Sequence, residues 1–247
     1  MGLPWRVVPA DPLAALTDLP GVAEAADSAR DAVDAVHRHP ANRRGWAANA
    51  SEASVRAARS SSGLDGGPTQ LASDVHDPVL AGALRVAAAL DGQVARWPRS
   101  PLQVLARLHL LAAADLAPQA ELGRPRPGTG GRLELLGQLS TGGTRAPAAV
   151  LAAVVHGELL GLAAFGTADG VVARAASRLV LVSTGLDVHN LTVPEVSWLR
   201  HPAQYRSAAA GFAAGTPEGV AAWVIGCCAA LAAGAREAGS IADAAAS

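Results

Sequence analysis

The chain has 247 residues and a formal net charge of −1, and it is 50% apolar and 17% charged, which is typical of a globular protein. All 20 basic residues are arginines, which excludes a P-loop, a Schiff base and a pyridoxal-phosphate site because each needs a lysine. Without a basic excess, nucleic acid is not expected as a partner. Few aromatic residues and abundant alanine predict an all-α fold.

The two cysteines, Cys227 and Cys228, are adjacent in an apolar stretch, which suits neither a structural disulfide nor a metal site. They are typical of buried thiols in a reducing cytoplasm. The first twelve residues contain Arg6 and three prolines and lack a continuous apolar run, so no signal peptide is expected. We therefore expect a cytoplasmic protein.

Three parts are expected along the chain, together forming one compact unit. They are an N-terminal arm over 1–18, N-terminal helices over 19–120 and a core over 121–247. Prolines make the arm irregular. In the arm, Trp5 is either an anchor onto the body or a contact for a partner.

Apolar residues at helical spacing predict the helices of the N-terminal part. These helices cover residues 19–37, 47–59, 78–94 and 101–115, with a loop over 42–46 between the first two. His109 lies in the last of these helices with no second histidine near it in sequence. This favours a hydrogen-bonded core histidine over a metal ligand.

Two stretches are predicted to be irregular. Ser61-Ser-Gly-Leu-Asp65-Gly66 has the composition of a turn. Residues 122–132 are rich in Gly and Pro and contain three arginines, which predicts a basic surface loop.

Residues 151–162 are apolar with few breaks and predict a helix buried nearly all round. A loop over Gly166–Gly170 follows, and a second apolar helix is predicted over 171–184. A loop at a helix N-terminus presents unpaired backbone N–H groups and the positive end of the helix dipole, and Arg174 adds charge one turn later. The pattern outlines an anion site, although a plain connection between two helices has the same composition.

The last part of the chain is predicted to hold a linker over 187–194 and a helix over 196–211. Thr216-Pro-Glu218 then starts a helix to about Glu237, with Thr as cap and Pro at the first position. Residues 219–235 are uncharged, but this run is shorter than the ~20 residues that a bilayer requires. We expect a packing helix and no membrane partner.

Residues 163–174 resemble the signature of the Fic (Fido) family, which reads His-Pro-Phe-x-Asp/Glu-Gly-Asn-Gly-Arg-x-x-Arg. Phe165, Gly170 and Arg174 match it identically. His156, seven residues before the position of the motif histidine, also resembles a helical histidine of the family. The resemblance implies a Fic-like helical bundle in which residues 122–132 form a short β-hairpin flap.

Three functional positions depart from the signature. The motif histidine, which takes a proton from the target hydroxyl in the family, corresponds to Ala163, and the metal-binding acid corresponds to Thr167. The first motif arginine corresponds to Val171. Asp169 stands where the family has a neutral amide; it is a weak candidate for a displaced metal ligand, and its charge repels phosphate.

The turn over 61–66 resembles the autoinhibitory motif of the family, Ser/Thr-x-x-x-Glu-Gly/Asn, with Ser61, Asp65 and Gly66 as the matching positions. In the family the glutamate of this motif pairs with the last motif arginine and blocks productive ATP binding. The resemblance therefore implies an ion pair between Asp65 and Arg174. Asp is one methylene shorter than Glu, so the two backbones must approach by about a further 1.5 Å.

Three hypotheses follow for the function. The favoured one is a catalytically inactive pseudo-adenylyltransferase that acts as a binding or regulatory protein, because Ala163 cannot take a proton. The alternative is an active Fic-type nucleotidyl- or phosphotransferase that modifies a protein hydroxyl through a non-standard site. A third reading is a helical bundle without an ancestral site.

If an anion still binds, the candidate residues are Thr167, Ala168, Asp169, Gly170 and Arg174. No cofactor is expected, and ATP with Mg²⁺ would bind only if the ancestral site survives. The expected partner is a protein of unknown identity. A homo-oligomer is left open.

Overall fold

The computed structural model describes residues 11–71 and 76–246, and this part of the chain is all-α, with no strand. The predicted contact of Trp5 lies outside the described residues. The helices are α1 (Ala14–Thr17), α2 (Val22–Arg38), α3 (Asn42–Leu64), α4 (Pro78–Ala89), α5 (Asp91–Val94), α6 (Pro101–Ala112), α7 (Gly130–Gln138), α8 (Ala148–Leu162), α9 (Asp169–Ser183), α10 (Pro194–Arg200), α11 (Pro202–Ala214) and α12 (Pro217–Ala246), with one π-helical turn, η1 (Leu139–Gly143).

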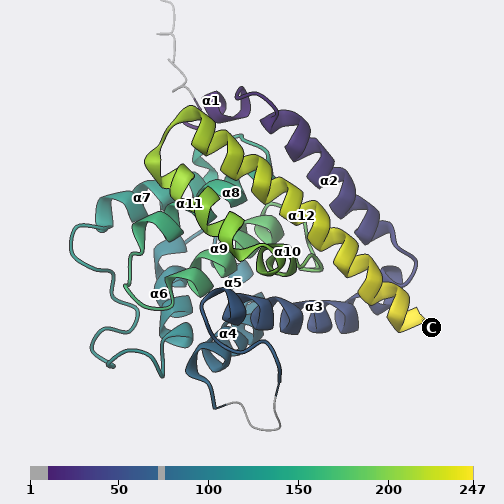
Figure 1. Ribbon diagram of the computed structural model, residues 1–247, viewed down its shortest axis with the longest axis horizontal. Helices are drawn as coiled ribbons and strands as arrows, with labels where there is room; N and C mark the ends of the chain where they lie inside the picture. Colours follow the sequence, from purple (N-terminus) through teal and green to yellow (C-terminus); the bar gives the residue numbers. More distant parts are fainter. Residues whose placement is uncertain (1–10, 72–75, 247) are drawn as a thin grey trace, which may run out of the picture.

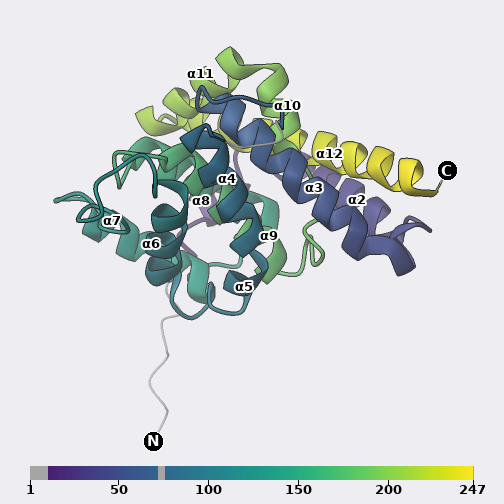
Figure 2. The ribbon, with the colours of Figure 1, turned by 90° about the horizontal axis from the view of Figure 1, so that it is seen from below.

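Helices α8 and α9 form the centre of the molecule and pack along each other. Helix α12 crosses the face seen in Figure 1, with α2 alongside it and α10 and α11 on its other side. Seen from below in Figure 2, α3 and α4 lie next to α9. Helices α8 and α9 are therefore flanked by helices from both halves of the chain.

One hydrophobic core joins the predicted N-terminal helices to the predicted core region. It contains α2 residues such as Val22 and Val33 as well as α12 residues such as Trp223 and Val224. Helix α8 is buried on nearly every side, as its sequence predicts, because small residues let the neighbouring helices α2, α7, α9, α11 and α12 approach it closely.

The loop predicted over residues 42–46 is wrong, since α3 begins at Asn42 and runs without a break to Leu64. Asn42 is buried: its side-chain amide donates to Val36 O at 2.9 Å, and its Oδ1 accepts from Asn49 Nδ2 at 2.7 Å. These tertiary bonds offset the low helix propensity of Gly45. The turn predicted over 61–66 is likewise mostly the last turn of α3, with Asp65 as its C-cap.

The β-hairpin flap predicted near residues 122–132 is also wrong. This segment is a series of turns, and α7 begins at Gly130. Pro125 and Pro127 lack the N–H groups that a hairpin ladder needs. Instead, the backbone N–H of Arg126 donates to Ala164 O at 2.7 Å, which ties the segment to the link between α8 and α9.

Other helix boundaries differ from the predicted ones where a proline or a short break intervenes. The helix predicted over 78–94 is divided into α4 and α5, and the one predicted over 101–115 ends at Ala112. The helix predicted over 196–211 is divided at Pro202, which has no N–H to continue α10.

Helix α12 has 30 residues and extends past the predicted end at Glu237. It is the one described helix that is long and apolar enough to cross a membrane, and half of its most apolar window is buried inside the protein. The buried side packs against α2, α8, α10 and α11. Its predicted N-cap is present, because Thr216 Oγ1 accepts from Gly219 N at 3.1 Å.

Candidate functional site at the link between helices α8 and α9

The link between α8 and α9 is built from left-handed residues. Ala163 ends α8 with φ of 42°, Gly166 has φ of 81°, and Ala168 precedes α9 with φ of 52°. Two of these positions hold alanine, which adopts this region at a cost of about 1 kcal/mol or more. The surrounding contacts therefore fix the loop in a conformation that its own sequence does not favour.

The carboxylate of Asp169 turns back onto the loop. Its Oδ1 accepts from the backbone N–H of Phe165 at 2.9 Å. Burial raises the pKa of Asp169, while the N–H groups of Phe165 and Gly166 and the guanidinium of Arg126 favour its charged form. A backbone donor that could have bound an external anion is thus already paired with a carboxylate of the chain.

Arg174, on the second turn of α9, is 2% exposed and makes four polar contacts. Its Nε donates to Ser61 Oγ at 2.8 Å, and its Nη2 donates to Ser61 O at 3.1 Å. The same Nη2 lies 2.8 Å from Asp65 Oδ2, so the predicted ion pair between Asp65 and Arg174 is present. A cation at the last turn of α3 also meets the negative end of that helix dipole.

Gly170 makes the close approach of Asp65 possible. A Cβ built at this position would lie within 3 Å of the Asp65 carboxylate. The absence of a side chain at Gly170 therefore compensates for the shorter reach of Asp relative to Glu. Gly66, the third residue of the predicted motif, has φ of 88° and turns the chain away from α3.

The fourth contact of Arg174 is one that the sequence did not predict. Its Nη1 donates to the hydroxyl of Tyr205 on α11 at 3.4 Å, and this hydroxyl in turn lies 2.7 Å from His156 Nε2. The hydroxyl thus accepts from Arg174 and shares a second hydrogen bond with the ring of His156. Burial, followed by the charge of Arg174, holds the pKa of His156 well below its usual value of 6.5, so the ring is neutral.

His109, predicted to be a hydrogen-bonded core histidine, supports the loop directly. Its ring stacks on Phe165 with centroids 4.3 Å apart, and its Nε2 lies 3.0 Å from Thr167 Oγ1. Its Nδ1 accepts from Gly123 N at 2.9 Å, so Nε2 carries the proton and donates to Thr167. Burial also lowers the pKa of His109, which favours this neutral form.

A pocket of about 220 Å³ lies on the outer side of the loop. Its lining includes Asp65 and all four loop residues predicted to bind an anion, which are Thr167, Ala168, Asp169 and Gly170. Arg174 is behind this wall. Arg126, another residue that the sequence did not single out, passes beside Gly166 and donates to Leu162 O at 3.2 Å.

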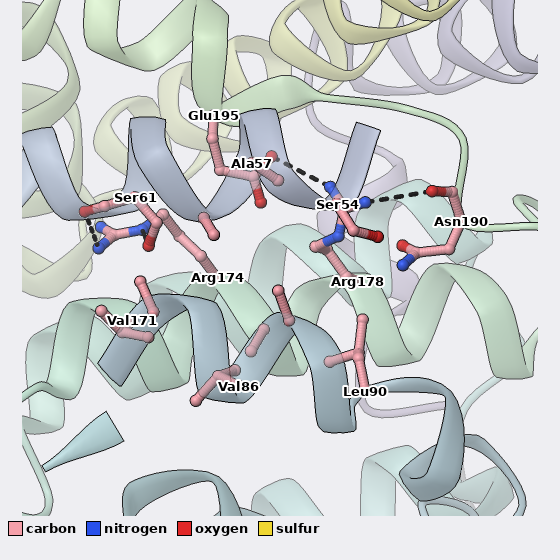
Figure 3. Close-up of a pocket in the computed structure, with 14 residues that line it drawn as sticks. Ser54, Ala57, Ser61, Val86, Leu90, Val171, Arg174, Arg178, Asn190 and Glu195 are labelled. Carbon is pink, nitrogen blue, oxygen red and sulfur yellow. Dashed lines mark hydrogen bonds and ion pairs between the residues drawn. The ribbon is translucent and has the colours of Figure 1, made fainter. Parts of the chain in front are cut away.

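A second buried arginine lies one turn further along α9. Arg178 Nη1 is 3.1 Å from Glu195 Oε2 and donates to Thr192 O at 2.8 Å, and Nη2 donates to Asn190 O at 3.2 Å. Figure 3 shows both arginines along one small cavity between α3, α4 and α9. This cavity has a volume of about 30 Å³, which is room for about one or two water molecules and not for a nucleotide.

The residues present do not fit the magnesium ion that the family resemblance implies. Thr167 has a neutral hydroxyl that already accepts from His109, and the Asp169 carboxylate is directed at the backbone of its own loop. In residues 11–71 and 76–246, no three His, Cys, Asp or Glu side chains are grouped so that they could hold a metal ion. A hard cation requires several oxygen ligands directed at one point.

No protein-family model matches the chain, and no curated protein matches it in sequence. Among solved structures, it is similar to the crystal structure of a Fic family protein from Desulfovibrio desulfuricans G20. The TM-score is 0.68 and the sequence identity 16%, over 97% of this chain and 77% of that chain. The chain therefore has a Fic-like, all-α fold. At this identity, the similarity extends to the fold and not to the activity.

Proposed function

We propose that this chain is a pseudo-adenylyltransferase, a protein that keeps the Fic-like fold without nucleotidyl transfer and acts as a binding or regulatory protein. The observation that carries the proposal is Ala163. It occupies the position of the family's catalytic histidine at the end of α8, and its methyl group cannot accept a proton. A positioned general base contributes about 10² to 10⁴ in rate.

No neighbouring histidine replaces that base. His156 lies seven residues earlier on α8, which is about 10.5 Å along the helix axis, and its ring is enclosed by Trp198, Tyr205 and Trp223. His109 is nearer, but both of its ring nitrogens are engaged and the ring is 1% exposed. Neither histidine presents a free nitrogen to the loop pocket.

The arrangement of charge also supports a loss of transfer. The family's phosphate-binding positions meet two carboxylates here, Asp65 and Asp169, which line the same pocket. Arg174 is neutralised by Asp65 and donates its remaining N–H groups to Ser61 and Tyr205. A nucleotide triphosphate would have to displace one carboxylate and approach the other, which costs Coulomb energy.

The alternative function, transfer through a non-standard site, is favoured by one feature. The loop pocket of about 220 Å³ is open and adjoins both the α9 N-terminus and Arg126, which together attract an anion. This makes nucleotide labelling the decisive experiment for the proposal.

The experiment incubates the purified chain with each of the four nucleoside triphosphates, labelled at the α-phosphate or at the γ-phosphate, and Mg²⁺, with and without a lysate of the native cell. The variants are Asp65→Ala, which frees Arg174, and Asp65→Ala combined with Arg174→Ala. We expect no covalent label on any protein in any sample. Label that appears with Asp65→Ala and disappears when Arg174→Ala is added would overturn the proposal in favour of the active transferase.

A further inference from the structure

A groove of about 410 Å³ is lined by Tyr205 and other residues of α10 and α11 on one side and by α12 on the other. Its volume is within the range of about 300 to 1,000 Å³ that is typical of small-molecule sites. None of its lining residues belongs to the loop between α8 and α9. The groove is thus a separate feature from the site described above.

The groove exists because α12 carries small residues where it faces α11. Ala222, Gly226, Ala229 and Ala233 line it at helical spacing and leave space that larger side chains would fill. A Cβ placed on Gly226 would meet no atom within 4 Å. The floor is therefore apolar, and its shape is open to a flat or extended molecule.

The opposite wall is aromatic and held in place by bonds behind it. Trp198 on α10 and Tyr205 on α11 stack with centroids 5.3 Å apart; beside them Trp223, on α12, is fixed by its Nε1, which donates to Ala153 O at 2.8 Å. The Tyr205 hydroxyl is taken by His156 and Arg174. This stacked pair is pre-formed, and the hydroxyl of Tyr205 is engaged behind the wall.

The polar rim of the groove carries positive charge and no acid. Arg236, His201 and Gln204 line it, and no Asp or Glu is among its described lining residues. Glu237, the neighbour of Arg236, is paired instead with Arg56 at 2.7 Å and Arg200 at 3.5 Å. One permanent cation beside an apolar floor matches one negative charge on an apolar body.

We propose that this groove binds a small apolar carboxylate, with its hydrocarbon part on α12 between Ala222 and Ala233 and its carboxylate on Arg236. The proposal goes beyond the loss of transfer proposed above and does not depend on it. Whether the loop site labels proteins has no bearing on binding in the groove.

The test is titration calorimetry with 2-naphthoate as the probe and neutral 2-naphthamide as its uncharged counterpart. Gly226→Leu fills the groove, and Gly239→Leu is the matched control, because Gly239 lies on the same helix, outside the groove lining, with equally open space around it. Both changes replace a helical glycine and should preserve or raise stability. A thermal melt of each variant verifies that it is folded.

We expect 2-naphthoate to bind the wild type and the Gly239→Leu variant equally, and not to bind the Gly226→Leu variant. Arg236→Gln should weaken binding about tenfold or more, which is the size of a lost charge-assisted hydrogen bond. The proposal is overturned if 2-naphthoate does not bind the wild type at millimolar concentration, if naphthamide binds as well as naphthoate, or if Gly226→Leu binds like the wild type.

Discussion

Arg174 and Arg178 lie one turn apart on α9, along the same cavity in Figure 3, yet their surroundings differ. Arg178 pairs with Glu195, whose side chain is 2% exposed, and its other bonds go to backbone carbonyls. Arg174 pairs with Asp65, which is 25% exposed at the edge of the loop pocket. The Arg178–Glu195 pair is closed off from solvent, whereas the Arg174–Asp65 pair is partly open to it.

The difference separates a structural pair from one that a ligand can open. Breaking a fully buried pair leaves a charge with no water to solvate it, so the pair persists as long as the fold does. Asp65 can turn into the pocket and be solvated there, and Arg174 would still keep its bonds to Ser61 and Tyr205. We infer that the Asp65–Arg174 pair can open toward the loop pocket, whereas the Arg178–Glu195 pair is a fixed support.

The largest effect is expected from Glu195→Ala. The change leaves the Arg178 guanidinium buried without its counter-charge, which should lower the free energy of unfolding by about 3–5 kcal/mol. Urea denaturation followed by circular dichroism measures it. Glu195→Gln keeps an acceptor for Arg178 and should cost clearly less. A loss below 1 kcal/mol for the alanine variant would show that the pair is not structural.

The free energy of unfolding should depend on pH through His156, which is linked to Arg174 by the Tyr205 hydroxyl. The folded chain holds His156 neutral because its pKa is lowered, while the unfolded chain takes up a proton below about pH 6.5. The contribution of neutral His156 to the free energy of unfolding is therefore fully present above that pH. Below it, the free energy of unfolding falls by up to about 1.4 kcal/mol per pH unit. Between pH 6.5 and 5 the loss should be about 2 kcal/mol, with His109 acting in the same direction.

Urea midpoints measured across that range test this pH dependence. His156→Gln should remove most of the slope, whereas His201→Gln, at an exposed position, should leave it unchanged. A slope in His156→Gln as steep as that of the wild type would assign the titration to other groups and contradict the neutral His156 ring.

Asp65→Ala should cost about 2–3 kcal/mol, less than Glu195→Ala, because it too leaves a buried guanidinium without its counter-charge but water from the loop pocket can take the place of the lost carboxylate. Arg174 loses a single partner and keeps its bonds to Ser61 and Tyr205, and the lost carboxylate was partly solvated. Comparing the urea midpoints of the two alanine variants tests the central contrast directly. Equal costs would mean that both pairs are structural and that Asp65 does not open.

The sequence predicted the helices around this site better than its polar contacts. Phe165, Gly170 and Arg174 match the family signature, and Asp65 follows a serine at the spacing of the family's inhibitory motif, so the resemblance implied that Asp65 and Arg174 meet. Tyr205 and His109 reach Arg174 and Thr167 from helices 31 and 58 residues away in sequence. No local pattern encodes such contacts.

Arg178 did carry a signal that the sequence reading passed over. It is a charged residue inside an apolar helical run, and such a residue requires a buried partner. The partner, Glu195, comes from a segment predicted to be partly linker, which in the structure is buried by its bonds to Arg178 and Asp187. The prediction of a hairpin was wrong for a different reason. It rested on the family resemblance alone, although the prolines of this segment lack the N–H groups that a hairpin needs.

Gly170→Ala should have the smallest effect on stability, and it is the most specific test of the contact between Asp65 and Gly170. In the wild type, Gly170→Ala should change stability little, because the better helix former gains up to about 1 kcal/mol while its Cβ pushes the Asp65 carboxylate off Arg174. In the Asp65→Ala variant there is no carboxylate to displace, so Gly170→Ala should show only the gain in helix propensity. The cycle of the two substitutions should therefore give a coupling of about 1 kcal/mol by urea denaturation. Additive effects would show that Asp65 does not rest on Gly170 in solution, and the inferred opening of the pair would lose its basis.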